Sequence, residues 1–188
     1  MPPTSPVALP TAPTASVREP LRPGGLSRRD FFDETVERLR PLLPTDLAGF
    51  RPKANPILLK LEFGNERVHY EVAPDGARAR LEVGLHFEDG PVSTAAYLAW
   101  FGRHIVELKH ELGAEVELER WTASWGRLYE LHPLGRLDSA AAERTAGRLA
   151  AFIVALQPLV EAAGIAPERS AAPSEQRGPW RTWRRGRG

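Results

Sequence analysis

Apolar and polar residues alternate along three consecutive stretches in the middle of the chain, which is the pattern of half-buried β-strands. The longest stretch covers residues 79–87, and those at 58–63 and 67–72 precede it. Gly64-Asn65 and Asp75-Gly76 separate the stretches, and both dipeptides are typical of tight two-residue hairpin turns. The pattern therefore predicts a three-stranded antiparallel meander with one apolar and one charged face.

Two-residue turns would also set the register of this meander. On the apolar face they place Leu61 opposite Val68 and Val72 opposite Ala79. On the charged face they bring opposite charges together, in the pairs Glu62–Arg67, Glu71–Arg80 and Glu82–His69. Each pair contributes on the order of a few tenths of a kcal/mol, so solvated cross-strand ion pairs account for these residues without a substrate. The alternative is a cleft in which Glu82 tunes His69 as a general base.

Three further stretches carry apolar residues at helical spacing. The first helix is expected to begin at Ser27, whose side chain can cap it. The second begins at Ser93 and ends at Gly113, and the third begins at Asp138 and ends at Gly164. Glycine at these ends fits the left-handed conformation that closes many helices.

Two short strands, at 115–119 and 128–132, are expected between the second and third helices. The order α-β-β-β-α-β-β-α predicts an α+β fold, a two-layer sandwich in which helices cover one face of an antiparallel sheet. We expect a single domain at 26–165. It follows a disordered proline-rich tail at 1–25 and precedes a flexible tail at 166–188 that is rich in tryptophan, arginine and glycine.

Composition narrows the functional classes. The formal net charge of the 188 residues is +1, so the whole molecule is not an obvious polyanion binder. The absence of cysteine excludes disulfides, thiolate metal sites and cysteine nucleophiles, and it fits a reducing compartment. The chain shows neither a signal-peptide pattern at its start nor an apolar run of about 20 residues. We therefore expect a cytoplasmic protein without a membrane partner.

The five histidines do not form a metal-binding motif in the sequence. His104 and His110 lie six residues apart on one expected helix, which does not place them on the same face. The remaining three, His69, His86 and His132, are scattered. Hydrolase, P-loop and Rossmann motifs are also missing. The sequence thus predicts no catalytic residue, no metal and no cofactor.

A metal-dependent nuclease or other phosphodiesterase is the enzymatic alternative. It would use acids of the meander, such as Glu62, Glu71 and Glu82. The element order is similar to that of the PD-(D/E)xK nucleases, which hold Mg²⁺ with two carboxylates beside a lysine. The matching strand reads Glu82-Val83-Gly84 and lacks that lysine, which disfavours the nuclease hypothesis.

The C-terminal tail combines arginines with two tryptophans. Arginine contacts phosphate, and tryptophan stacks on unpaired bases. The residues in question are Arg177, Trp180, Arg181, Trp183, Arg184, Arg185 and Arg187. Single-stranded nucleic acid is the first expected partner, and an acidic protein surface is the second. That surface could be the strand with Glu115, Glu117 and Glu119 in a second copy, so a homodimer remains open. A tail without a partner is the third possibility.

Residues 78–163 resemble an uncharacterised bacterial domain family found at the C-terminal end of restriction- or defence-associated proteins. The likeness rests on the strand at 80–87, the helix ending in Leu112-Gly113, the strand and tryptophan at 115–121, and the final helix. It implies an accessory domain that acts near nucleic acid, with no catalytic residue to carry over. The element order is also similar to that of dimeric type III secretion chaperones. The sequence as a whole favours a non-enzymatic binding or accessory module.

Overall fold

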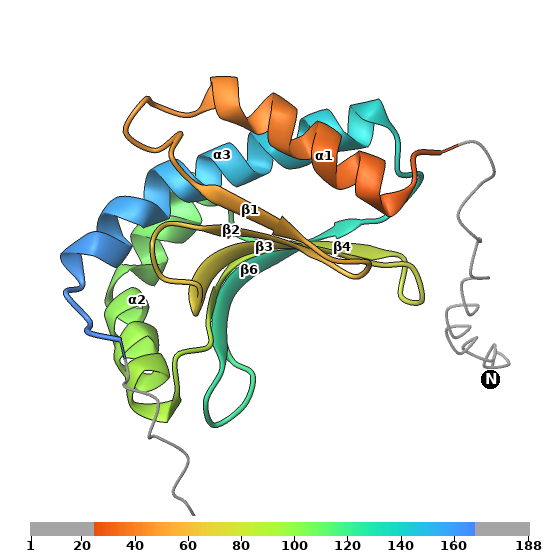
Figure 1. The fold of residues 1–188 in the computed structure, drawn as a ribbon. Helices are drawn as coiled ribbons and strands as arrows, with labels where there is room; N and C mark the ends of the chain where they lie inside the picture. The colour runs from red at the N-terminus through yellow and green to blue at the C-terminus, as the bar shows by residue number, and fades with distance from the viewer. Residues whose placement is uncertain (1–24, 168–188) are drawn as a thin grey trace, which may run out of the picture.

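Six antiparallel strands form a single sheet in the computed structural model, which describes residues 25–167 (Figure 1). The spatial order of the strands is β1-β2-β3-β4-β6-β5. Helices α1 and α3 pack against each other on one face of this sheet, and α2 lies beside its β5–β6 end. In chain order the elements are α1 (Arg28–Leu39), the 3-10 turn η1 (Arg40–Leu42), β1 (Arg51–Ala54), β2 (Leu59–Glu62), β3 (Val68–Asp75), β4 (Arg80–Phe87), α2 (Pro91–Leu112), β5 (Glu117–Arg120), β6 (Gly126–Pro133) and α3 (Ser139–Ala162).

The predicted α+β sandwich is therefore confirmed, with one additional strand. The apolar–polar pattern did not predict β1, which forms the edge of the sheet beside β2. All four of its residues are exposed, and the second is Pro52. An edge strand without a buried face carries no alternation of apolar and polar residues, so the pattern could not reveal it.

The predicted helix ends are largely correct. The side chains of Ser27 and Asp138 accept hydrogen bonds from the backbone N–H groups of Asp30 and Ala141, which caps α1 and α3. Gly113 closes α2 with a φ of +119°, a conformation that residues with a side chain rarely adopt. Helix α2 begins at Pro91, before the expected Ser93, because proline is pre-organised for the first helical position.

The predicted register of the meander is wrong, although its faces are right. Leu61 lies opposite Tyr70, two residues beyond the expected Val68, and Val72 lies opposite Val83, four residues beyond the expected Ala79. An even shift leaves every side chain on the same face. The cross-strand pairs Glu62–Arg67, Glu71–Arg80 and Glu82–His69 consequently do not form.

Longer loops are the cause of the shift. Residues 63–67 and 76–79 connect the strands in place of two-residue turns. The side chain of Asn65 accepts a hydrogen bond from the backbone N–H of Arg67, and that of Asp75 accepts one from Arg78. These short polar side chains stabilise wider turns than the glycine dipeptides suggest.

Helix α3 is long and apolar enough to span a membrane, by length and composition alone, and no other helix of residues 25–167 meets these criteria. Its apolar side chains nevertheless pack in the core of this domain. Leu149, Phe152, Ile153 and Leu156 are fully buried between α1 and the sheet. A core helix of an α+β domain accounts for this composition.

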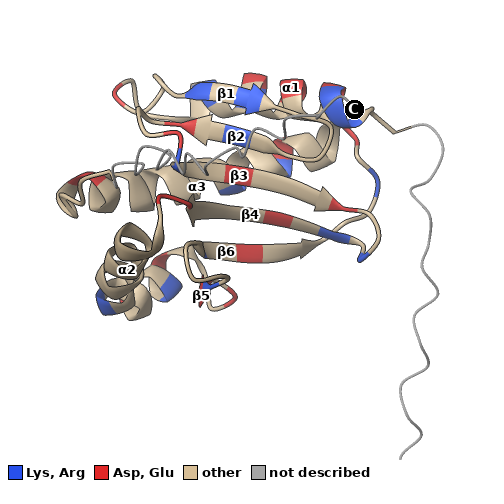
Figure 2. Ribbon diagram, turned by 60° about the horizontal axis from the view of Figure 1, so that its bottom comes forward, with Lys and Arg blue, Asp and Glu red and all other residues tan. Residues whose placement is uncertain are grey.

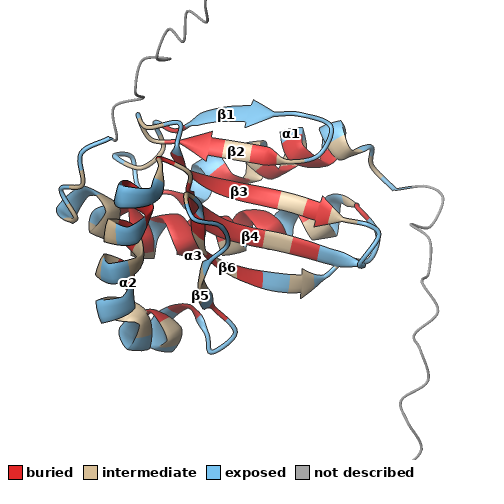
Figure 3. Ribbon diagram, turned by 90° about the horizontal axis from the view of Figure 1, so that it is seen from below, coloured by how far each residue is buried: buried red, intermediate tan, exposed pale blue. Residues whose placement is uncertain are grey.

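Most charged residues of the strands alternate onto the opposite face of the sheet, whereas Glu130 of β6 lies on the helix-covered side; Figure 2 marks the positions of the charged residues along the strands. Helices α1 and α3 lie behind the sheet in a view of this face, which leaves the strands open to the viewer (Figure 3). Several ionisable side chains on it are nonetheless buried, with exposed fractions of 0% for His69, 7% for Glu71 and 2% for His86. Because buried ionisable groups require partners, these side chains indicate a candidate site on this face.

Gly84 lies in the middle of β4, where the neighbouring strand approaches closely. A Cβ atom at this position would lie 2.7 Å from the Cβ of Tyr129 and 2.8 Å from the backbone oxygen of Leu128. We expect Gly84→Ala to lower the free energy of unfolding by about 1–3 kcal/mol, because β6 has to move. Urea denaturation measures this loss.

The matched control for this prediction is Gly147→Ala. Gly147 lies exposed in α3, and an added Cβ there meets nothing within 4 Å. Because alanine favours a helix over glycine by up to about 1 kcal/mol, the control is expected to be stabilising. Equal stability of the two variants would contradict the close approach at Gly84.

Candidate metal centre

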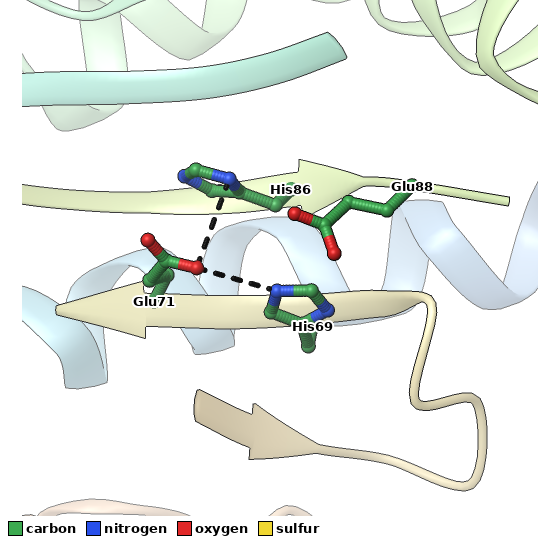
Figure 4. Close-up of side chains that lie close together, drawn as sticks. All are labelled: His69, Glu71, His86 and Glu88. Carbon is green, nitrogen blue, oxygen red and sulfur yellow. Dashed lines mark ion pairs between the residues drawn. The ribbon is translucent and has the colours of Figure 1, made fainter. Parts of the chain in front are cut away.

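Four buried or half-buried side chains converge on the open face of the sheet (Figure 4). His69 of β3 and His86 of β4 lie directly opposite each other in the ladder. Glu71 follows His69 by two residues and Glu88 follows His86 by two, so alternation places all four on one face. Each residue offers one ligand atom, and these atoms all lie within 4.8 Å of one another.

Hydrogen bonds fix the orientation of the His69 ring. Its Nδ1 lies 2.8 Å from the backbone oxygen of Glu66. Because a carbonyl oxygen only accepts, Nδ1 carries the proton and donates it. The buried Nε2 has no hydrogen-bond partner, and its neighbour is Glu71 Oε2 at 3.5 Å. The free nitrogen of His69 therefore points at a carboxylate oxygen.

The His86 ring is oriented in the same way. Its Nε2 donates to Glu82 Oε1 at 3.0 Å, which leaves Nδ1 to face Glu71 Oε2 at 4.0 Å. Metal-binding histidines generally donate their second ring nitrogen to a carbonyl or a carboxylate in this manner. His69 and His86 thus each show one of the two outer-shell arrangements that accompany metal ligation.

Strand β6 supports this arrangement from outside. Arg127 donates to Glu82 Oε2 and to Glu119 Oε2, both at 2.7 Å. Its guanidinium also lies over the ring of Tyr129, 3.9 Å from the centroid. Glu82 is therefore held between His86 and Arg127, which fixes the tautomer and the direction of the His86 ring.

The cluster carries more negative than positive charge. With both histidines neutral, the carboxylates of Glu71, Glu82 and Glu88 outnumber the cations of Lys60 and Arg127. Lys60 lies 3.0 Å from Glu88 Oε2 and 4.0 Å from Glu71 Oε2. An ionised Glu71 in this position favours a cation beside it.

Two contacts of the cluster are close to the spacing that a transition-metal ion needs. Bonds of about 2.0–2.2 Å place tetrahedral ligand atoms about 3.4 Å apart. The contact of 3.5 Å between His69 and Glu71 already has this length, and the 4.0 Å contact of His86 needs a small contraction. Two imidazoles and two carboxylates suit zinc and its first-row neighbours. Glu88 follows the end of β4 and is half-buried, so its side chain can adjust.

A groove of about 810 Å³ runs along the open face from this cluster toward the β3–β4 hairpin. Glu71 and His86 belong to its wall, as does Glu82. The remaining lining comes from the start of α1, the residues before β2, the β3–β4 hairpin, the β5–β6 loop with Trp121, and β6. The candidate metal centre therefore faces a space large enough for a ligand.

The residues considered for a nuclease do not gather as that hypothesis requires. Glu62 pairs with Lys53 at 2.9 Å, and Glu82 pairs with Arg127. Of the three acids, only Glu71 belongs to the cluster. In the acidic strand, Glu117 pairs with Lys109 and Glu119 with Arg127.

The predicted nucleic-acid-binding residues of the tail lie outside the described residues. These are Arg177, Trp180, Arg181, Trp183, Arg184, Arg185 and Arg187. Their role therefore stays a prediction.

The sequence carries a signal for this cluster that differs from the common metal-binding motifs. His69-Tyr70-Glu71 and His86-Phe87-Glu88 repeat the pattern His-x-Glu on two expected strands. Alternation alone places all four polar side chains on one face. The wrong register then moved His69 opposite Glu82 and away from His86, so the two halves of the site did not appear together.

Comparison with known proteins gives no identity for this arrangement. No family model matches the chain, and neither a curated protein nor a solved structure matches it.

Proposed function

We propose that this domain is a binding module that holds one divalent transition-metal ion, Zn²⁺ in the first place. The ligands are His69 through Nε2, His86 through Nδ1, Glu71 and Glu88. One observation carries the proposal: the buried Nε2 of His69 has no hydrogen-bond partner and lies 3.5 Å from a carboxylate oxygen. A buried acceptor that faces another acceptor is costly unless a cation lies between them.

The competing interpretation places a second proton on His69. The imidazolium would then form an ordinary ion pair with Glu71, and no metal would be needed. Both interpretations predict the same contact, but they differ in the response to added zinc. Only a metal site gains stability from the ion, because the ion binds the folded chain in preference to the unfolded one.

The zinc experiment uses the full-length protein, stripped with a chelator and titrated with ZnCl₂ in a calorimeter. We expect one ion per chain. At a free zinc concentration 100 times the dissociation constant, the free energy of unfolding should rise by about 2.7 kcal/mol. His69→Gln is expected to abolish both effects, and Glu88→Gln, at the half-buried position, to weaken them. Unchanged zinc binding by both variants would refute the site.

A matched control distinguishes the cluster from adventitious binding. His110 lies exposed on α2, outside the four-residue cluster. His110→Gln should therefore leave the stoichiometry and the stabilisation unchanged.

Cobalt provides a second readout, because Co²⁺ in a tetrahedral site absorbs visible light much more strongly than the hydrated ion does.

Binding is favoured over hydrolysis because the acids beside the cluster are already engaged. A hydrolytic zinc centre needs a general base that is free to activate water. Glu82 is not free to act as this base, since it accepts hydrogen bonds from His86 and Arg127. Incubation of the zinc-loaded protein with plasmid and single-stranded DNA tests whether the centre is hydrolytic. Zinc-dependent cleavage that is lost in Glu71→Gln would favour hydrolysis over binding.

A further inference from the structure

We infer that the groove beside the metal centre binds a nucleotide, either free or within a single strand, with its phosphate at the ion and its base on Trp121. This inference rests on the proposed zinc site, and it adds the chemical class of the ligand. Three independent features of the groove support it: its charge, its length and its aromatic wall.

The charge of the lining favours an anion once the metal is bound. Four arginines line the groove, Arg28, Arg78, Arg80 and Arg127, against three acids, Glu71, Asp75 and Glu82, which gives a net charge of +1. A divalent ion raises this sum to +3. The ion and the arginines then attract phosphate from the same side of the sheet.

Arg80 is available for such a contact. It lies exposed at the start of β4, opposite Asp75, while Asp75 binds Arg78 at 2.9 Å. Within residues 25–167, Arg80 forms no ion pair of its own, whereas Arg127 is saturated by Glu82 and Glu119. Arg80 lies six residues from His86 on β4, about 20 Å along the strand, so it can bind a later phosphate of an oligonucleotide but not the phosphate at the ion.

The length of the groove exceeds that of a single phosphate. Glu71 and Asp75 both belong to its wall and are four residues apart on β3, which corresponds to about 13 Å of strand. Its volume of about 810 Å³ lies in the range of small-molecule sites. This length leaves room for further nucleotides of an oligonucleotide that runs from the ion toward the β3–β4 hairpin.

The wall formed by the β5–β6 hairpin presents an aromatic surface. Trp121 is 53% exposed although it lines the groove, and the exposed Trp125 lies next to it with 5.9 Å between the ring centroids. Arg127 lies over the Trp121 ring at 4.8 Å and holds it in place. An indole that is fixed on one side and open on the other is a platform for a planar base.

The test measures binding of two probes to the zinc-loaded, full-length protein by calorimetry: adenosine monophosphate and a short single-stranded oligonucleotide. We expect binding that is lost when the metal is removed. Trp121→Ala should weaken it about 5- to 150-fold, the equivalent of one stacked base. Arg80→Gln should lower the salt dependence of oligonucleotide binding, whereas Arg144→Gln, at an exposed position on α3, should not.

Zinc stoichiometry, measured on the same samples, separates this inference from the proposed function. If every variant binds one zinc ion but Trp121→Ala binds both probes like the parent protein, the inference is overturned and the metal site stands. If the chain binds no zinc, both fall. If the oligonucleotide binds much more tightly than adenosine monophosphate, the site is assigned to nucleic acid. If the two probes bind with comparable affinity, it is assigned to a free nucleotide.

The tail needs its own control, because Trp180 and Trp183 could bind the same oligonucleotide. The double variant Trp180→Ala with Trp183→Ala should keep the zinc-dependent binding of both probes. Loss of all binding in this variant, with full binding in Trp121→Ala, would place the contact on the tail and overturn the groove inference.

Discussion

Arg148→Ala is expected to lower the free energy of unfolding by about 3 kcal/mol. Arg148 of α3 donates to both carboxylate oxygens of Glu130, at 2.7 and 2.6 Å, and to the backbone oxygen of Leu112 at 2.8 Å. Glu130 is 4% exposed on the helix-covered side of β6. Removal of the Arg148 side chain leaves a buried carboxylate whose remaining contact is His132, and it removes the hydrogen bond between α3 and the last residue of α2.

Two further variants identify the orphaned charge as the cause. Adding Glu130→Gln to Arg148→Ala should recover part of the loss, because the neutral amide tolerates burial better than a lone carboxylate. Arg144→Ala removes an exposed arginine one turn earlier in α3 and should change stability by less than about 0.5 kcal/mol. Urea denaturation of the four proteins measures these differences. Equal effects of Arg144→Ala and Arg148→Ala would contradict the orphaned charge as the cause.

The same ion pair has a signature in acid. Burial raises the pKa of Glu130, but its bonds to His132 and Arg148 outweigh burial and hold the pKa below the ordinary 4.5. The unfolded chain therefore takes up this proton at a higher pH than the folded chain does. The contribution of the pair is present above pH 4.5 and is lost as the pH falls through the folded-state value. Arg148→Ala should show a smaller loss of stability over this interval.

Local rules sufficed to derive the layers of this fold from the sequence. Capping residues such as Ser27 and Asp138, and the apolar stripe of α3, are properties of neighbouring residues, and each was read correctly. The alternation at 80–87 likewise determined which side chains face the core. Because the period of a strand is two, the faces survive any even error in pairing.

Register could not be derived in the same way, and the candidate site depended on it. The turns at Asn65 and Asp75 are widened by hydrogen bonds from single side chains, which no pattern of apolar residues records. His69 meets His86 only in the register that these loops impose. Each half of the metal site is a His-x-Glu pair that is visible in the sequence. The loops bring the two pairs together, and their geometry is not visible in the pattern of apolar residues.

Tyr70→Phe is expected to remove much of the loss of stability that the parent protein shows above pH 10. Tyr70 is 1% exposed in the core, and its hydroxyl donates to Gln157 Oε1 at 3.3 Å. Burial, with the charge of Glu161 as a second cause, raises its pKa well above the ordinary 10.0. The buried phenol therefore keeps its proton at a pH where the unfolded chain has released it.

The sign of the effect follows from this difference. Above pH 10.0 the folded chain binds one proton more than the unfolded chain at Tyr70, so the free energy of unfolding falls as the pH rises. A single group contributes up to about 1.4 kcal/mol per pH unit in this interval. Tyr70→Phe lacks the ionisable group. It should be less stable than the parent by about 1 kcal/mol at neutral pH, through the lost hydrogen bond, and should approach or exceed the parent in alkali.

Tyr129→Phe is the matched control, because Tyr129 is half-buried in the groove and not in the core. Burial also raises the pKa of Tyr129, but this variant keeps Tyr70 and with it the steep alkaline slope. Urea denaturation over a series of pH values from neutral to above 10, with tyrosinate absorbance followed in parallel, compares the three proteins. Parallel stability curves for Tyr70→Phe and the parent would show that the unfolded chain and the folded core release this proton at the same pH, which a phenol sealed between β3 and α3 cannot do.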